Sequence, residues 1–178
     1  QALSRDSAQT MKTRWPLEDM RGEDLLAAAV RRIETVCVCR AAADAAAPDL
    51  WLSVDSYSLL QALTSLAGRL ADEHDVKLVR LRLARTDTHA QLDLLWQGPS
   101  MSTETVIGWE TEPMCVGAES VALTVRDVVQ RHDGEFWFER ERVRHSSFFR
   151  MLLPLAAPSE ALEAAAVLRG MTDVKNPS

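Results

Sequence analysis

The chain has 178 residues, of which 47% are hydrophobic and 26% charged, the balance of one ordinary globular domain. Its net charge of −6 argues against a general nucleic-acid binder, and no apolar run approaches the length of a transmembrane helix. The first residues lack both an initiator Met and the apolar segment of a signal peptide, so we expect an excised piece of a longer cytoplasmic protein.

The first half of the chain predicts a polar segment, a helix and two strands. Leu25, Leu26 and Ile33 share one face of the helix, because apolar residues recur there every three or four positions. The segment 35–39 is short and β-branched, as strands are. In order, the predicted elements are a linker or the end of an upstream helix over 1–15, a helix over 23–34, a strand over 35–39, an Ala-rich loop over 41–47 and a strand over 50–54.

The second half predicts a long helix followed by paired strands. Asp55 is a favoured N-cap residue, and leucines follow it on one helix face until the polar cluster 72–75. Gly134 is predicted to take the left-handed conformation that ends many helices. In order, the elements are a helix from Asp55, strands over 77–85 and 90–96, an irregular segment over 100–116, a helix over 118–132, strands over 135–140 and 147–153, and a short helix from Pro158 to Gly170.

This order predicts an α/β (α+β) fold. Strands paired by hairpins, with helices between the pairs, form a two-layer sandwich with a mixed, mostly antiparallel sheet and helices on one face. We expect three parts: a linker or helix end over 1–15, one domain over 16–156, and a C-terminal helix and tail over 157–178.

Glycines, cysteines and histidines limit the kinds of binding site. The closest two of the seven glycines are nine residues apart, which excludes the phosphate loops GxGxxG and GxxxxGK[ST]. Three cysteines without a secretory signal favour a reducing compartment. On a strand, Cys37 and Cys39 would point to the same face, and we interpret them as small buried hydrophobes. The four histidines show no ligand-like pairing, so no metal site is predicted.

Three sequence strings resemble one known family. Residues 125–139 (VRDVVQRHDGEFWFE) are similar to a helix and strand written IVxxIVExHGG and xIWVES, residues 148–154 (FFRMLLP) to FxFxLP, and residues 55–63 (DSYSLLQAL) to the start of an N-box helix. In this order and spacing, residues 17–155 resemble the ATPase domain of sensor histidine kinases, in the GHKL superfamily. The resemblance implies the histidine kinase ATPase-like fold and a relation to two-component signal transduction.

The resemblance allows the metal site to be checked residue by residue. The family's N-box helix carries two asparagines, and the second holds Mg²⁺ on the ATP phosphates. The matching positions here are Ser65 and Arg69. An arginine has no acceptor atom and carries a fixed positive charge, so Arg69 cannot ligate Mg²⁺.

The adenine and phosphate positions are altered as well. The family's DxGxG motif falls on residues 96–100, where Trp96 replaces the adenine-binding aspartate, Gly98 remains and Ser100 replaces the second glycine. The glycine-rich lid falls near Gly117 and Glu119, and the carboxylate would repel phosphates. We therefore predict a degenerate nucleotide site that does not use Mg-ATP, with no catalytic residue, no metal and no cofactor.

Two expectations concern packing around this site. Trp96 lies on the inward phase of Leu92 and Leu94, and we expect its indole to fill the space that adenine would occupy. The segment 100–116 matches the family's ATP lid, and without a phosphate to hold it we expect it to be the most mobile interior region.

Other residues leave alternatives open. Trp15 and Trp109 either pack onto the sandwich or mark a partner surface. A set of basic residues forms either a solvated sheet face or an anionic docking surface: Lys77, Arg80, Arg82, Arg85, Arg140, Arg142, Arg144 and Arg150. The kinase's phosphoacceptor histidine is not recognisable, since only His74 precedes an acid, and we place His74 in a solvated turn.

The first hypothesis is a non-catalytic, histidine-kinase-like ATPase domain that acts as a regulatory or structural module in a bacterial signalling or multidomain protein. The sequence also resembles degenerate kinase-like regions of proteobacterial proteins that carry an exonuclease domain of the DNA polymerase III epsilon type. Its partners would be other domains of the parent protein or a second copy in a homodimer, with no direct nucleic-acid binding. The alternative is a divergent kinase that still binds ATP, with Arg69 replacing the metal.

Overall fold

Helices and strands follow one another much as the sequence predicts. The computed structural model describes residues 17–98 and 100–156. In chain order its elements are β1 (Glu18–Arg21), α2 (Gly22–Val36), β2 (Arg40–Ala46), β3 (Trp51–Val54), α3 (Ser56–His74), β4 (Leu78–Arg85), β5 (His89–Gln97), α4 (Thr103–Thr111), β6 (Pro113–Val116), β7 (Glu119–Thr124), α5 (Val125–Arg131), β8 (Glu135–Glu141) and β9 (Ser146–Pro154).

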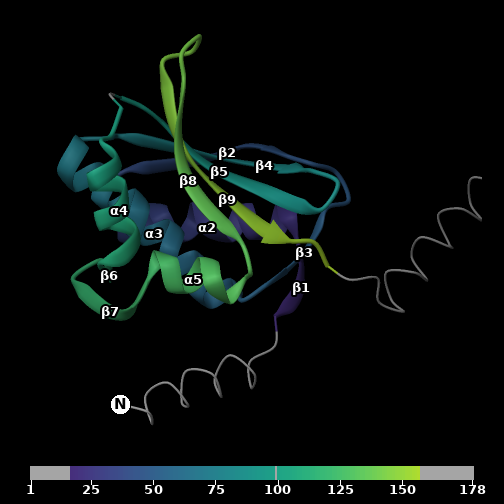
Figure 1. Ribbon diagram of the computed structural model, residues 1–178. Coiled ribbons are helices and arrows are strands. Elements are labelled where there is room, and N and C mark those ends of the chain that lie inside the picture. The colour runs from purple at the N-terminus through teal and green to yellow at the C-terminus, as the bar shows by residue number, and fades with distance from the viewer. Residues whose placement is uncertain (1–16, 99, 157–178) are drawn as a thin grey trace, which may run out of the picture.

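The main sheet has five strands in the order β2-β4-β5-β9-β8. β2 runs parallel to β4, and the other neighbours pair antiparallel. Figure 1 shows α2, α3 and α5 gathered on one side of this sheet. Two short antiparallel pairs, β1–β3 and β6–β7, stand apart from it. The predicted two-layer sandwich with a mixed, mostly antiparallel sheet is confirmed.

Alternation along the strands builds the core. On β4, Val79, Leu81 and Leu83 are at most 2% exposed, whereas Arg80 and Arg82 lie on the other face of the sheet. α2 packs against α3, β2 and β4, so one apolar layer is shared by the helices and the sheet. Each fully buried leucine contributes roughly 1.5–3 kcal/mol to this layer.

Both ends of α3 are fixed by aspartates. Asp55 caps the N-terminus, where its carboxylate accepts a hydrogen bond from the Ser58 amide at 3.5 Å. Asp75 ends the helix in the left-handed conformation, at a φ of 55°, which short polar residues tolerate better than most. The predicted start at Asp55 and end in the polar cluster are confirmed.

His132 joins the end of α5 to the start of α3. Its ring is 1% exposed, Nδ1 donates to Val128 O at 2.7 Å, and Nε2 accepts the Asp55 amide proton at 2.9 Å. Only the neutral ring with its proton on Nδ1 satisfies both bonds. The neighbouring Arg131 pairs with the Asp55 carboxylate at 2.8 Å. Burial lowers the pKa of His132 and keeps this ring neutral.

The predictions for residues 35–47 are wrong in two places. Thr35 lies in α2, where its hydroxyl donates to Arg31 O at 2.7 Å, and the helix runs to Val36, so there is no strand over 35–39. The expected Ala-rich loop over 41–47 is the strand β2. Pairing with β4 decides its conformation, because tertiary partners override the weak strand preference of alanine.

The predictions for residues 100–132 also need correction. The expected irregular segment 100–116 contains α4, capped by Ser102, whose hydroxyl accepts the Thr105 amide proton at 3.1 Å. Only the second half of the expected helix over 118–132 is helical. α5 begins after Thr124, which forms a capping box with Asp127, and the residues before it form β7.

The turn after α5 differs from its prediction. Asp133 takes the left-handed conformation, with a φ of 48°, and Gly134 does not. Gly134 is needed for another reason: a Cβ at this position would overlap Leu152 O of β9. Glycine therefore permits a close approach of backbone to backbone between this turn and β9.

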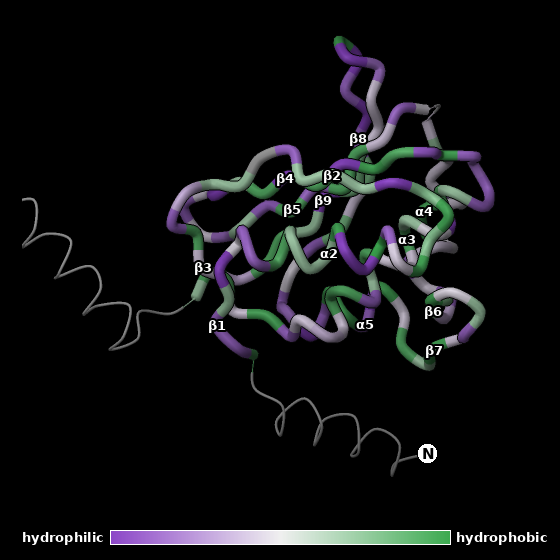
Figure 2. Tube along the Cα trace, turned by 180° about the vertical axis from the view of Figure 1, so that it is seen from behind, coloured by the Kyte–Doolittle hydropathy of each residue, from purple (hydrophilic) through white to green (hydrophobic). Residues whose placement is uncertain are grey.

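The hairpin that joins β8 to β9 projects away from the rest of the molecule (Figure 1), and its residues are mostly hydrophilic (Figure 2). The predicted linker over 1–15 and the C-terminal helix and tail over 157–178 lie outside the described residues, so the three-part division stays a prediction. None of the helices within 17–98 and 100–156 is long and apolar enough to cross a membrane.

Replacing Gly134 with alanine should destabilise the protein. The new Cβ would overlap Leu152 O, and moving the strand to relieve this contact should cost about 1–3 kcal/mol. Gly108→Ala is the matched control, because its Cβ would meet only the Glu112 carboxylate at 3.5 Å. Alanine inside α4 should stabilise the protein by about 0.5–1 kcal/mol. Urea unfolding measures both effects, and equal stabilities would contradict the prediction.

Stability should depend on pH through His132. Burial lowers its pKa below the ordinary 6.5, so the unfolded chain takes up a proton before the folded one does. The contribution of the neutral ring is complete above pH about 6.5 and is lost as the pH falls toward the lower pKa of the folded state. The free energy of unfolding of the wild type should therefore fall more steeply below that pH than that of His132→Gln. Parallel curves would show that the prediction is wrong.

Candidate functional site

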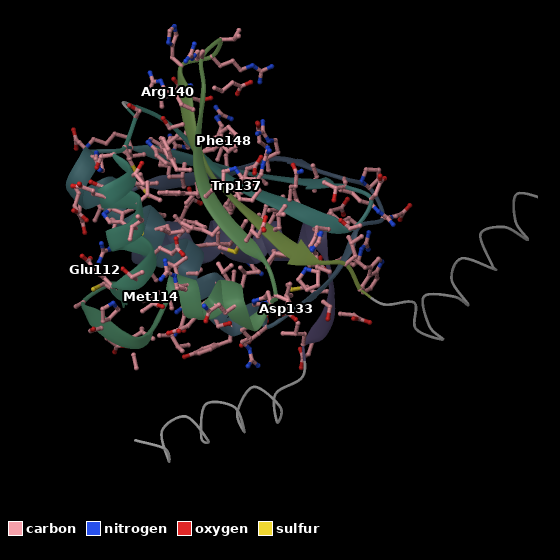
Figure 3. The ribbon with its side chains drawn as sticks, in the orientation of Figure 1. Glu112, Met114, Asp133, Trp137, Arg140 and Phe148 are labelled. Atoms are coloured by element: carbon pink, nitrogen blue, oxygen red, sulfur yellow. The ribbon has the colours of Figure 1, made fainter. Side chains whose placement is uncertain are left out.

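Ser65 and Arg69 are one turn apart on α3 and both contact the segment that leads into β6. Ser65 is 3% exposed, and its hydroxyl accepts the Cys115 amide proton at 3.2 Å. Arg69 Nη2 lies 2.7 Å from Glu112 Oε2. Residues four apart share one helix face, so both positions of the predicted metal site are turned to this segment. Figure 3 shows Glu112 and Met114 on this side of the molecule, beside α4 and β6.

Trp109 lies under the Arg69 guanidinium. The guanidinium carbon is 5.7 Å from the centre of the Trp109 ring, a cation–π distance. The indole is 4% exposed and also contacts the rings of His74, at 5.5 Å, and Phe149, at 6.1 Å. Of the two alternatives for Trp109, packing onto the sandwich is confirmed. His74 ends α3 against this ring, which corrects the expected solvated turn.

Trp96 is buried at the end of β5. Its ring is 3% exposed and lies 5.0 Å from Phe149 and 5.9 Å from Phe138. The predicted inward direction of Trp96 is confirmed. Gly98 covers one edge of the indole, since a Cβ there would lie 3.2 Å from Trp96 Cδ1. The Gly98 carbonyl accepts a hydrogen bond from Arg140 at 2.9 Å.

Phe149 brings the two tryptophans into one cluster. Trp109 packs against Arg69, and Trp96 lies two residues before Gly98. Both rings contact Phe149 on β9, an inner strand of the sheet. Arg69 and Trp96, which the sequence places on separate motifs, are therefore joined through two aromatic rings. Sequence reasoning missed Glu112 and Phe149 as members of this site, because the first pairs with Arg69 over a long separation and the second reads as an ordinary core residue.

The remaining predicted positions are exposed. Ser100 lies after β5, and Gly117 and Glu119 lie at the turn between β6 and β7. Gly117 has a φ of 65°, and a Cβ there would lie 3.5 Å from Val36 Cγ1 at the end of α2. The structure thus places Gly117 beside α2, whereas Arg69 and Trp96 meet the aromatic cluster.

The lid-like segment is tied down by two acids. Glu110 Oε2 lies 3.0 Å from Arg126 Nε of α5, and Glu112 pairs with Arg69 of α3. Met114, 1% exposed, fixes the start of β6 in the core. These contacts connect the segment to two helices, whereas the mobility expected for it stays a prediction.

Two members of the basic set pair with one buried carboxylate on the outer face of the sheet. Asp93 is 1% exposed and accepts hydrogen bonds from Arg82 and Arg150, each with a shortest distance of 2.8 Å. Hydrogen bonding to Asp93 raises the pKa of Arg150. Both guanidiniums also lie near the Phe148 ring, at 5.5 and 4.9 Å. This part of the predicted docking surface is therefore a closed ion-pair cluster.

The charged group at this site is the Arg69 guanidinium, which is paired with the Glu112 carboxylate. Arg69 supplies five donors and no acceptor, and the oxygens that face it belong to the Glu112 carboxylate. Among the residues that the structure describes, no group of three or more His, Cys, Asp and Glu side chains could hold a metal ion.

Comparisons with known structures place the fold. The chain is similar to the histidine kinase domain of the Escherichia coli osmosensor EnvZ, with a TM-score of 0.61 and 14% identity over 82% of this chain and 92% of that one. It is also similar to the ATP-binding domain of PrrB from Mycobacterium tuberculosis (TM-score 0.57, 15% identity, 80% and 98% covered). A histidine kinase from Burkholderia phymatum has a TM-score of 0.56 and 14% identity, with 88% and 78% covered.

No protein-family model and no curated protein matches the sequence. At these identities, the structural likeness shows the histidine kinase ATPase-like fold that the motif strings implied, and it shows the fold alone.

Trp109 should be a major contributor to stability. Trp109→Ala removes a buried indole that contacts Arg69, His74 and Phe149, at an expected cost of about 3–5 kcal/mol. Trp137→Ala is the matched control, because Trp137 is partly exposed on the outer face of β8. Urea denaturation of both variants should show at least twice the loss at position 109. A loss at Trp109 no larger than at Trp137 would contradict this account of the cluster.

Proposed function

We propose that this chain is a non-catalytic, histidine-kinase-like ATPase domain that acts as a regulatory or structural module within a larger bacterial protein. The observation that carries the proposal is the Arg69–Glu112 pair. It stands at the position where the family's Mg²⁺-binding asparagine would lie, and it is held at 2.7 Å against the buried Trp109.

Mg²⁺ requires oxygen ligands in near-octahedral geometry, and it is usually held by carboxylates together with substrate phosphates. Arg69 offers no oxygen, and its charge would repel the ion at short range. The Glu112 carboxylate has the right chemistry, but pairing with Arg69 already neutralises it. A metal at this place would have to break that pair and leave the arginine beside the ion.

The adenine side of the site supports the same proposal. A carboxylate at position 96 would accept a hydrogen bond from the adenine amino group, whereas the Trp96 indole offers a donor and no acceptor. Its ring is buried against Phe138 and Phe149, and we infer that it fills the space that adenine takes in the family.

A domain of this kind would work through contacts with other domains of its parent protein, or with a second copy of itself, in the cytoplasm. The net charge of −6 favours protein contacts over direct nucleic-acid binding. A bacterial parent that also carries an exonuclease of the polymerase III epsilon type fits the sequence resemblance and belongs to this proposal.

One observation favours a second candidate, a divergent domain that binds ATP without metal. The Arg69 side chain is 18% exposed, so an anionic phosphate could reach the guanidinium by displacing Glu112, whose side chain is 55% exposed. Arginine forms strong bidentate bonds with phosphate.

Calorimetry with ATP, in Mg²⁺ and in EDTA, tests the proposal. We expect no binding tighter than a Kd of ~1 mM, equivalent to about −4 kcal/mol, in either condition. Arg69→Asn, which restores the family's residue, should not create binding, because Trp96 still occupies the adenine position.

The variants also separate the two candidates. A Mg²⁺-dependent Kd below ~1 mM in the wild type would overturn the proposal. Binding that is independent of Mg²⁺, lost in Arg69→Gln and kept in the control Arg126→Gln, would establish the second candidate instead. Arg126 is a suitable control because it pairs with the adjacent acid Glu110 and lies outside the family's N-box.

A further inference from the structure

Cys37 and Cys39 lie at the bend that connects α2 to β2. The backbone bends over residues 37–39, and Val38 points outward with 85% of its surface exposed. The cysteines on either side of it are half-buried and pack against the core. Although this segment is not the predicted strand, both thiols turn to the same side of the chain, as that prediction required.

Cys37 is held against α3. It caps the C-terminus of α2, where its amide donates to Ile33 O at 2.8 Å. Its Sγ lies 3.3 Å from Thr64 O, close enough for the thiol to donate a hydrogen bond. Gly68, one turn further along α3, lies beside the sulfur, since a Cβ there would be in van der Waals contact with Cys37 Sγ at 3.6 Å. The position of Cys37 is thus fixed by two helices.

The two thiols differ in acidity. A hydrogen bond between them, together with burial, raises the pKa of Cys37. The same hydrogen bond lowers the pKa of Cys39, against the opposing effects of burial and of the charges of Glu34 and Asp72. Glu34 is partly occupied in accepting the Ala41 amide proton at 3.3 Å. The thiolate therefore forms first on Cys39, and the single Cys37 proton turns from Thr64 O to this sulfur.

We propose that Cys37 and Cys39 form a dithiol site that reacts with small-molecule disulfides and closes to an intramolecular disulfide. Consecutive Cα atoms are about 3.8 Å apart, so the Cα atoms of the two cysteines are at most roughly 7 Å apart before the bend shortens that distance. A disulfide spans Cα distances of about 4.4–6.8 Å. The bend over residues 37–39 shortens the distance toward this range.

The reaction takes place in two exchange steps. The Cys39 thiolate attacks one sulfur of the small disulfide, which forms a mixed disulfide and releases one small thiolate. Cys37 then loses its proton to the solvent, attacks the Cys39 sulfur and releases the second small thiolate. The two protein thiols lose two electrons in total, and one small disulfide is reduced to two thiols, which take up the protons.

Cys115 provides an internal comparison. It is the most exposed of the three cysteines and lies on β6. If exposure alone controlled reactivity, Cys115 would react first. Because reactivity follows the thiolate fraction, we expect Cys39 to react faster than Cys115 near neutral pH.

The test uses the full chain with mixtures of oxidised and reduced glutathione, followed by acid quenching and intact-mass and peptide mapping. In a Cys115→Ser background, the product should have lost two hydrogens and should contain the Cys37–Cys39 bond. Cys37→Ser in the same background should stop at a glutathione adduct on Cys39. Cys39→Ser should slow modification of Cys37 at least about tenfold, because the more acidic thiol is gone.

Alkylation rates supply a second readout. Cys37→Ala should slow the alkylation of Cys39, because the hydrogen bond that stabilises its thiolate is lost, and denaturing urea should abolish the difference between Cys39 and Cys115. The proposal is overturned if the folded Cys115→Ser protein accumulates only glutathione adducts, if it resists oxidation, or if Cys115 reacts faster than Cys39 in the wild type.

Discussion

The position of Phe149 on the inner strand β9 is the constraint on which this end of the sandwich depends. Its ring lies within 6.1 Å of those of Trp96, Trp109, Phe136 and Phe138, which come from β5, α4 and β8. Each aromatic pair contributes about 0.5–1.5 kcal/mol beyond its buried area. A continuous aromatic cluster therefore fills the space between α3, which carries Arg69, and the end of β5 at Gln97. Any ligand there would have to displace part of this cluster.

The cluster also explains how a charged residue is accommodated on α3. Arg69 extends over the face of Trp109 and ends on Glu112, so its stem is covered and its charge is paired without burial of either charge in full. Guanidinium groups suit this arrangement because they are weakly hydrated and stack on aromatic rings. The segment that carries Trp109 and Glu112 therefore contacts α3 through both residues.

The fold was largely readable from local patterns, and the site was not. Asp55 and the leucines after it define α3 within the sequence window that a helix occupies, and alternation defines β4 and β5. β2 was not predicted because alanine has a weak strand preference. Its conformation depends on pairing with β4, which lies more than 30 residues further along the chain. Ser102 and Thr124 are N-cap residues, so the starts of α4 and α5 could have been predicted from the local sequence. The Arg69–Glu112 pair joins residues far apart in sequence, so the motif comparison identified one partner and only the tertiary structure supplied the other.

The Asp44 carboxylate lies on β2, an outer strand of the sheet, and helps to protect this edge against strand addition. Within the described part of the chain, β2 and β8 are the sheet's two margins, where backbone donors and acceptors are free to recruit a strand from another molecule. β2 carries Asp44, paired with Arg80 at 3.5 Å, and its register shifts between Ala43 and Ala45. A charge and an irregular ladder both disfavour strand addition. A segment of alanines that would otherwise be suited to intermolecular strand pairing is thereby kept at the edge of the sheet without recruiting a further strand.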